Sequence, residues 1–193
     1  MDVPATETDP RILAFAEKAT PLGTQVDHVR DVDGLLALIR SAAAEAGTQH
    51  VWIAPQLLGY APDLAQHLTA AGLEPCPVTD RESARDQAIG LSLASRAIVE
   101  TGSVLLDERT IEDRAPSIMT LHCLTIVPMD RVASTLDDVV TALRQMANHA
   151  AGGYGSFVTG PSRTADIEMS LTVGVQGPRQ VSVIFVDHLT TTG

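Results

Sequence analysis

Segments with strand character alternate with segments of helical periodicity along most of this chain. Apolar residues recur at intervals of three and four over residues 32–46, which predicts a helix, and residues 24–29 and 50–54 on either side have the composition of strands. The chain closes with residues 180–186, a run rich in β-branched residues that suits a buried strand. Strands separated by helices predict an α/β fold with a largely parallel sheet covered on both faces.

The remaining elements follow from the same patterns and from their flanking residues. Three further helices are predicted, over residues 10–19, 62–71 and 134–150. Five further strands are predicted, over residues 73–78, 96–99, 103–106, 121–127 and 156–158. Residues 81–89 could be helical. Asp9 and Asp31 stand at helix N-cap positions, and Pro75 and Pro77 favour an edge or irregular strand.

Residues 96–99 and 103–106 are separated only by the Glu100-Thr101-Gly102 segment. Such a short connection predicts a local antiparallel hairpin, because parallel strands need a longer crossover. The sheet is therefore expected to be mixed.

Length and composition limit the class of protein. At 193 residues with 45% apolar residues, the chain is long enough for one domain with a real core, and residues 1–193 are taken as that domain. Aromatic residues make up only 3%, so Ala, Val, Leu and Ile must build the core. No apolar run approaches the roughly 20 residues of a membrane span. The acidic, polar N-terminus lacks the pattern of a signal peptide, so we expect a cytoplasmic protein without a membrane span.

Charge and cysteine usage exclude further classes. The formal net charge of −11 argues against nucleic acid as a partner, since phosphate binding needs a basic face. Cys76 and Cys123 form no Cys-x-x-Cys pair, so the sequence gives no case for zinc or an iron–sulfur cluster held by this chain alone. We expect Cys123, inside an apolar run, to be a buried free thiol. The histidines have no spacing that suggests a metal site.

Polar and small residues are concentrated in residues 159–168. Gly160-Pro161 forces a turn after the apolar pair Phe157-Val158, and Ser162, Arg163, Thr164 and Asp166 follow within a few residues. A strand that ends in such a turn and leads into a helix presents backbone N–H groups to an anion.

Each of these polar residues has a structural alternative. The fork of Arg163 suits a small carboxylate or a phosphate, but it could instead pair with Asp166 or Glu168. The hydroxyls of Ser162 and Thr164 could do no more than cap the helix. Asp166 could bind a ligand hydroxyl or compete for Arg163.

Residues 100–103 are the second candidate segment. Glu100 ends an apolar run and could orient a substrate hydroxyl, accept a proton or act as a nucleophile, or its oxygens could simply bind nearby backbone N–H groups in the turn. Gly102 is explained by the backbone freedom that the turn needs. His122 begins a strong strand, where a satisfied structural histidine is more common than a catalyst.

Four segments together carry a resemblance to a known family. These are residues 97–103 (Ala-Ile-Val-Glu-Thr-Gly-Ser), 121–128, 159–168 (Thr-Gly-Pro-Ser-Arg-Thr-Ala-Asp-Ile-Glu) and 174–179 (Gly-Val-Gln-Gly-Pro-Arg). In this order they resemble the LUD domain family, the lactate utilization protein C group, over roughly residues 30–187. The resemblance implies a three-layer α/β/α sandwich similar to the NagB/RpiA/CoA-transferase superfamily.

The resemblance also implies a role in oxidising L-lactate to pyruvate, as a subunit beside partner proteins that carry the iron–sulfur clusters. On this view the chain itself binds no cofactor, and it is uncertain as an enzyme in isolation. A small carboxylate or other anion would lie in a cleft between two segments. The residues expected to bind it are Thr101, Gly102, Ser103, Gly160, Ser162, Arg163, Thr164 and Asp166, with Glu100 as the catalytic candidate.

One residue departs from the family pattern. Gln176 stands where the family is expected to have histidine, and glutamine cannot exchange a proton near neutral pH.

Two other functions stay open. The chain could instead be a non-catalytic module that docks or regulates the cluster-bearing partners. It could also be a stand-alone transferase or isomerase, for which fold analogy alone is a weak argument.

Overall fold

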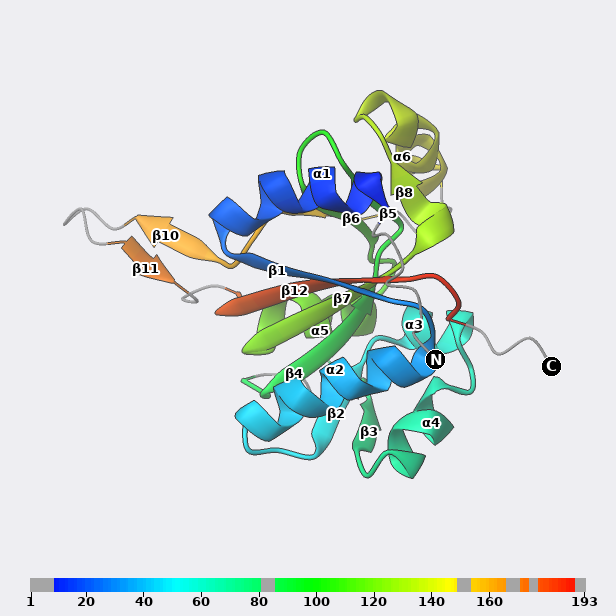
Figure 1. The fold of residues 1–193 in the computed structure, drawn as a ribbon, viewed down its shortest axis with the longest axis vertical. Helices are drawn as coiled ribbons and strands as arrows, with labels where there is room; N and C mark the ends of the chain where they lie inside the picture. Colours follow the sequence, from blue (N-terminus) through cyan, green and yellow to red (C-terminus); the bar gives the residue numbers. More distant parts are fainter. Residues whose placement is uncertain (1–8, 81–85, 149–153, 166–170, 174–176, 190–193) are drawn as a thin grey trace, which may run out of the picture.

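A parallel sheet of six strands lies at the centre of the computed structural model, which describes residues 9–80, 86–148, 154–165, 171–173 and 177–189. All neighbouring strands of this sheet are parallel, in the order β1-β12-β7-β4-β2-β3 (Figure 1). Its strands are β1 (Thr24–Val29), β2 (His50–Ile53), β3 (Glu74–Pro77), β4 (Ile89–Leu93), β7 (His122–Pro128) and β12 (Gln180–Val186).

Helices cover both faces of the sheet, which confirms the predicted α/β fold with a largely parallel sheet. The α-helices are α1 (Pro10–Ala19), α2 (Val32–Glu45), α3 (Pro55–Tyr60), α4 (Leu64–Ala70), α5 (Ile111–Met119) and α6 (Val140–Ala147). Short 3₁₀ turns are η1 (Thr20–Leu22), η2 (Met129–Arg131) and η3 (Asp137–Val139). As predicted, Asp9 and Asp31 cap α1 and α2 by accepting from the backbone N–H groups of Arg11 and Gly34.

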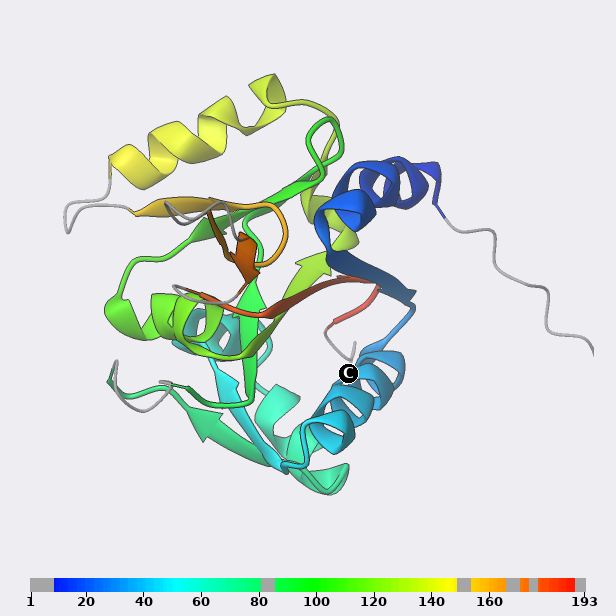
Figure 2. The same ribbon diagram turned by 90° about the vertical axis from the view of Figure 1, so that its left-hand side faces the viewer.

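A second sheet and helix α6 form additional layers above the main sheet (Figure 2). The second sheet has four strands in the order β8-β5-β6-β9, namely β8 (Val132–Ala133), β5 (Arg96–Ile98), β6 (Ser103–Asp107) and β9 (Gly155–Val158). The predicted antiparallel hairpin is confirmed as the β5–β6 pair. It belongs to this second sheet, and the central sheet is therefore wholly parallel.

The core divides along the two faces of the central sheet. On one face, α2 and α4 pack over alternate residues of the strands, including Leu124 and Ile126 of β7 and Ile184 of β12. On the other face, α1 and the second sheet enclose a smaller cluster in which the rings of Phe15 and Phe185 meet edge to face, 5.2 Å apart. Aliphatic residues make up most of both clusters, as the low aromatic content requires.

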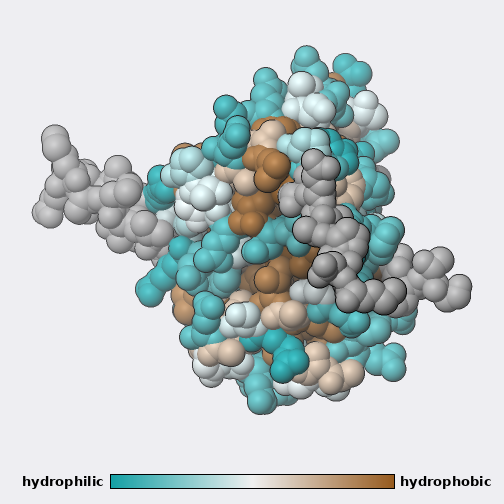
Figure 3. Space-filling model, viewed as in Figure 1, coloured by the Kyte–Doolittle hydropathy of each residue, from teal (hydrophilic) through white to brown (hydrophobic). Residues whose placement is uncertain are grey.

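Strand β1 forms an open edge of the central sheet. The space-filling view shows apolar side chains in the middle of this face, where β1 runs between α1 and α2 (Figure 3). Ile12, Leu13 and Val26 line a groove of about 350 Å³ there. Charged residues interrupt the edge, and His28 pairs with Asp187 at 2.8 Å, which blunts the edge against pairing with another chain.

Some elements were not predicted, and some predicted boundaries were wrong. The central strand β4 and the helices α3 and α5 were not predicted, and Ile89 opens β4 although residues 81–89 were read as possibly helical. Residues 81–85 lie outside the described residues. The helix predicted over residues 134–150 begins only at η3, and residues 149–150 are not described. The strand with the two prolines does lie at an edge, as predicted.

The expectation of a helix after Gly160-Pro161 was also wrong for the residues that the structure describes. Arg163–Ala165 form strand β10, which pairs antiparallel with β11 (Leu171–Val173). This small hairpin projects from one side of the molecule (Figure 1). A strand at this position removes the helix N-terminus that was expected to bind an anion.

Candidate functional site

The segments that carry the family pattern meet where three parallel strands begin. Strands β1, β12 and β7 start at one end of the sheet, and backbone contacts bring the other pattern segments to the same place. We call this region the motif junction. It comprises residues 18–24, 101–103, 121–122, 159–163 and 177–179.

A pair of hydroxyl groups joins the first two segments. Strands β6 and β9 are antiparallel, with Val104 opposite Val158, so Ser103 and Thr159 stand side by side at the end of the ladder. Their side-chain oxygens are 2.6 Å apart, and either can donate. Ser103 is buried. This contact links residues that are 56 positions apart and holds the two segments together.

Two glycines allow backbones to approach closely at the motif junction. Gly102 and Gly160 have φ angles of 64° and 80°, in the left-handed region that favours glycine. A Cβ atom at Gly102 would lie 2.7 Å from the backbone nitrogen of Ala19, and one at Gly160 would lie 2.6 Å from the carbonyl oxygen of Leu22. Both turns are therefore packed against the end of α1 and against η1.

Arg163 anchors the third segment to the same place. Its Nη2 donates to the carbonyl oxygen of Leu22 at 2.5 Å, and the side chain is otherwise exposed. The Ser162 N–H donates to the carbonyl oxygen of Pro178 at 3.0 Å, and the Arg179 N–H donates to that of Leu121 at 2.8 Å. An arginine has five N–H donors, and Leu22 is the one hydrogen-bond partner of the Arg163 side chain among the described residues.

Two buried hydroxyls of the motif junction lack a partner. Thr101 Oγ1 and Thr24 Oγ1 are enclosed, and neither has a hydrogen-bond partner among the described residues. Strand alternation places Thr24 on the face of β1 that α1 covers, opposite Val181. Buried polar atoms are nearly always hydrogen-bonded, so unpaired hydroxyls mark positions where another group is expected to bind.

The side chain of Glu100 bonds to the backbone of the segment that precedes η3. Its Oε2 accepts from the Leu136 N–H at 3.0 Å, and its own N–H donates to the carbonyl oxygen of Ser134 at 3.1 Å. Among the described residues, no contact joins the side chains of Glu100 and Arg163. The turn interpretation of Glu100 thus describes its observed contacts, and a role toward substrate stays a prediction.

Three residues of the predicted site and family pattern have no described side-chain contacts. Thr164 lies in β10 opposite Thr172. Asp166 lies outside the described residues, as does Gln176, the position that departs from the family pattern. Their predicted roles stay predictions.

A buried polar row on the α2 side of the sheet was not predicted. His122 Nε2 and Ser182 Oγ are 2.8 Å apart, and Ser182 Oγ donates to Gln25 Oε1 at 3.0 Å. Burial lowers the pKa of His122, and the nearby Glu45 opposes that shift. The row agrees with the structural interpretation of His122. The sequence did hold an indication of it, because His122 and Ser182 occupy inward positions in otherwise apolar strands.

The described residues give no support for a metal centre or a transmembrane helix. No group of three or more His, Cys, Asp or Glu residues among them could hold a metal ion. Cys123 is buried and free, as predicted, and burial raises the pKa of its thiol. No described helix combines the length and apolar character needed to cross a bilayer.

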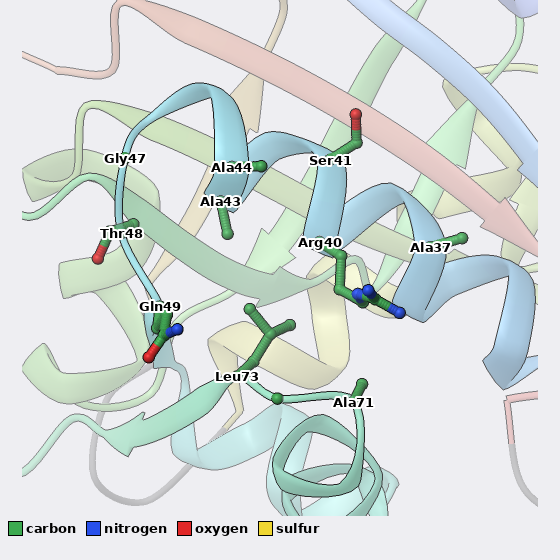
Figure 4. A pocket seen from close by; sticks show the side chains of 11 residues that line it. Ala37, Arg40, Ser41, Ala43, Ala44, Gly47, Thr48, Gln49, Ala71 and Leu73 are labelled. Carbon is green, nitrogen blue, oxygen red and sulfur yellow. The ribbon is translucent and has the colours of Figure 1, made fainter.

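A cavity away from the motif junction has little chemistry. It encloses about 900 Å³ between the end of α2 and the connection from α4 to β3 (Figure 4). Small side chains such as Ala37, Ala43 and Ala44 line much of it, with Arg40 at one side. Ser41, Thr48 and Gln49 also line it, but it contains none of the residues of the family pattern, so the cavity is not assigned to the site.

Comparisons with known proteins agree with this fold. A crystal structure described as a DUF162 family protein from Deinococcus radiodurans superimposes with a TM-score of 0.62 at 19% identity, covering 92% of this chain and 96% of that one. It shares the parallel α/β architecture. The LUD domain profile matches residues 12–186, and the chain therefore belongs to the LUD domain family. The match includes helix α1, which lay outside the resemblance over residues 30–187.

The chain is also similar to curated proteins called lactate utilization protein C. It is 27% identical over 191 residues to the one from Halalkalibacterium halodurans, covering 93% of this chain and 80% of that protein. It is 31% identical over 158 residues to the one from Geobacillus kaustophilus, covering 79% of this chain but 57% of the relative. For the Shouchella clausii protein, 30% identity extends over 107 residues and 47% of its length. This chain thus matches about half the length of some relatives.

Proposed function

We propose that this protein acts in lactate utilisation, as a subunit that works with separate iron–sulfur proteins in oxidising L-lactate to pyruvate. The names of its relatives supply the pathway. The absence of cofactor-ligand motifs in the sequence favours electron carriers that lie in partner chains. We further propose that the motif junction binds a small carboxylate or another anion.

One observation carries the assignment of the site. Two segments that are widely separated in the sequence pack closely at glycines, Gly102 against the end of α1 and Gly160 against η1. The Ser103–Thr159 pair holds these two segments together. The meeting of parts of all four pattern segments at one end of the sheet supports a binding site there, because binding residues are disproportionately placed on loops at the ends of a rigid sheet.

Arg163 is the proposed anchor for the anion. Its exposed guanidinium has Leu22 as its one partner in the described part of the chain, and a charge-assisted bidentate pair with a carboxylate is strong and directional. Thr101 and Ser103 supply hydroxyls on the opposite segment. Gly160, Ser162, Thr164 and Asp166 complete the proposed site as its turn and first strand. Glu100 would need to release Leu136 before it could orient a substrate hydroxyl.

Growth of a deletion strain on L-lactate as sole carbon source tests the pathway. Restoring the gene should restore growth, and the same strain should grow normally on glucose throughout. Equal growth on lactate with and without the gene, in a strain that lacks other lactate dehydrogenases, would exclude the proposed role.

Calorimetry on the purified protein tests the anion site separately. Arg163→Ala should weaken binding of L-lactate or pyruvate by more than about 1 kcal/mol, because a charge-assisted contact is lost. Arg144→Ala, which removes an exposed arginine of α6, is the matched control. Unchanged affinity in Arg163→Ala would argue against the anchor.

A docking or regulatory module is the second candidate, and the observed contacts of the polar side chains favour it. Glu100 bonds to the Leu136 backbone and Arg163 to the Leu22 backbone, so both already have structural partners. On this alternative, lactate oxidation by the reconstituted assembly survives substitution of both residues. Loss of turnover with intact assembly would instead support a role in binding substrate.

A further inference from the structure

Two aliphatic side chains and an arginine stand exposed together at the motif junction. Leu22 and Leu121 are each 38% exposed, and Arg179 is exposed as well. Leu22 precedes β1, Leu121 precedes β7 and Arg179 precedes β12, the strand that lies between the other two. Neighbouring strands are about 4.8 Å apart, so the three residues lie side by side at the amino ends of these strands. We call them the docking patch.

Hydrogen bonds to the backbone hold this arrangement. The Arg179 N–H donates to the carbonyl oxygen of Leu121 at 2.8 Å, and Arg163 Nη2 donates to that of Leu22 at 2.5 Å. The residues that precede the two arginines are joined to each other by an N–H···O=C hydrogen bond of 3.0 Å. The exposed Arg163 therefore lies beside the docking patch.

The motif junction is basic, although the chain as a whole is acidic. It contains Lys18, Arg163 and Arg179 and no acidic residue, whereas the chain has 24 acidic and 13 basic residues. Glu17 and Glu45 lie at its margin. In the described part of the chain, no ion pair joins a carboxylate to Arg163 or Arg179. A surface with this charge favours an acidic partner.

The docking patch suits a protein partner better than a small molecule. Small-molecule sites are concave and enclose most of the ligand, whereas all three side chains of the patch are exposed. Arginine is enriched where protein interfaces gain most of their binding energy, and apolar neighbours there exclude water. The surface that complements this patch therefore offers carboxylates to the guanidinium group and an aliphatic side chain to the leucines.

We propose that the docking patch binds an acidic segment of a partner protein. A carboxylate of that segment accepts from the Arg179 guanidinium, and an aliphatic side chain of it packs against Leu22 and Leu121. The docked segment lies beside Arg163. The proposal does not depend on lactate binding, because the three residues of the patch are not among those proposed to bind the small anion.

Photocross-linking of the full chain in its own cells tests the docking patch. p-Benzoylphenylalanine replaces Leu121, and mass spectrometry identifies the peptide that is joined to it. We expect a segment of another protein that is rich in Asp and Glu. Adding Arg179→Glu should lower the yield at least about tenfold, because like charges then meet at the patch. Arg144→Glu, at an exposed arginine of α6, is the matched control and should leave the yield unchanged.

The outcomes separate this surface from the proposed function. A yield that Arg179→Glu leaves unchanged, a cross-linked segment without acidic residues, a cross-link to a second copy of this chain, or no cross-link would each overturn the docking patch. If the probe at Leu121 disturbs folding, the same probe at Leu22 gives the same test. An acidic segment from a protein without an iron–sulfur cluster would support the docking patch and argue against the proposed assembly. An iron–sulfur protein whose capture survives Arg179→Glu would do the reverse.

Discussion

The motif junction and the cavity beneath α6, which Asp107, Arg96 and Gln145 line, differ in their relation to the family pattern. The motif junction gathers the pattern segments of the LUD family, and most of its contacts join backbones or close-packed glycines. The cavity beneath α6, lined by Asp107 and Arg96, uses none of those segments, and the buried Asp107 Oδ1 beside it has no hydrogen-bond partner among the described residues. Buried unpaired oxygens occur in both regions, because Thr24 Oγ1 and Thr101 Oγ1 lie at the motif junction. The family pattern, and not the unpaired atoms, therefore distinguishes the two regions.

Strand β6 supports both regions, and truncating its central side chain should have the largest effect. Leu105 is fully buried and packs against α6, so Leu105→Ala should lower the free energy of unfolding by about 2–5 kcal/mol. Hydrogen exchange should show faster opening of α6 than of α1, because α1 packs on the other side of β6 through Val104. Ile118→Ala, at a partly exposed position, should change stability by less than about 0.5 kcal/mol.

Two glycines with the same φ angle differ in their surroundings, so they separate the cost of close packing from the cost of a left-handed backbone. Gly160 and Gly72 both have φ of 80°, but a Cβ at Gly72 would meet nothing within 4 Å, whereas one at Gly160 would meet the Leu22 carbonyl. Gly72→Ala should cost about 1–2 kcal/mol, the strain of a left-handed residue alone. Gly160→Ala should cost at least about 1 kcal/mol more in urea unfolding. Equal losses would mean that the motif junction is not packed as described.

The hydroxyl pair between Ser103 and Thr159 gives a smaller test of the same region. A double-mutant cycle with Ser103→Ala and Thr159→Val should yield a coupling energy of about 0.5–1.5 kcal/mol, typical of one hydrogen bond. Urea unfolding of the four proteins measures it. Additive effects of the two substitutions would show that the segments are not coupled through this bond.

The smallest predicted effect concerns pH at the start of β7. Because burial lowers the pKa of His122 in the folded state, the unfolded chain takes up the proton first as pH falls. Stability should therefore be fully retained above the ordinary histidine range and decline below it. Between pH 7.5 and 5, wild type should lose up to about 1 kcal/mol more than His122→Gln. Parallel pH profiles of the two proteins would contradict this assignment.

Local patterns predicted most of the fold, and the exceptions have physical causes. Periodicity and caps located β1, α2 and β12, where each segment alone fixes its structure. Strand β4 was missed because Gly90 and Ser92 replace the large apolar residues that usually mark a buried strand. Gly90 is required there, since a Cβ would lie 2.6 Å from the Pro116 carbonyl oxygen. Helix α5 was missed because it contains Pro116, which normally ends a helix.

The candidate sites were harder to predict because they depend on contacts between distant segments. Residues 101–103 and 159–163 were singled out from the sequence and do meet through the Ser103–Thr159 contact, while their role in binding stays a prediction. The strand formed by Arg163–Ala165 follows from pairing with β11 and not from its own residues. The contact between Glu100 and Leu136 joins residues 36 positions apart. The unpaired Oδ1 of Asp107 likewise depends on how the second sheet and α6 pack, and no sequence motif predicts it.

Growth on L-lactate with an arginine variant tests the central claim most directly. In a deletion strain, the chain carrying Arg163→Gln should fail to restore growth on L-lactate, while Arg144→Gln should restore it fully at equal protein levels. That result would place the role in lactate utilisation at the motif junction. Full growth with Arg163→Gln would contradict the account, because the pattern segments would then converge without serving the function proposed for them.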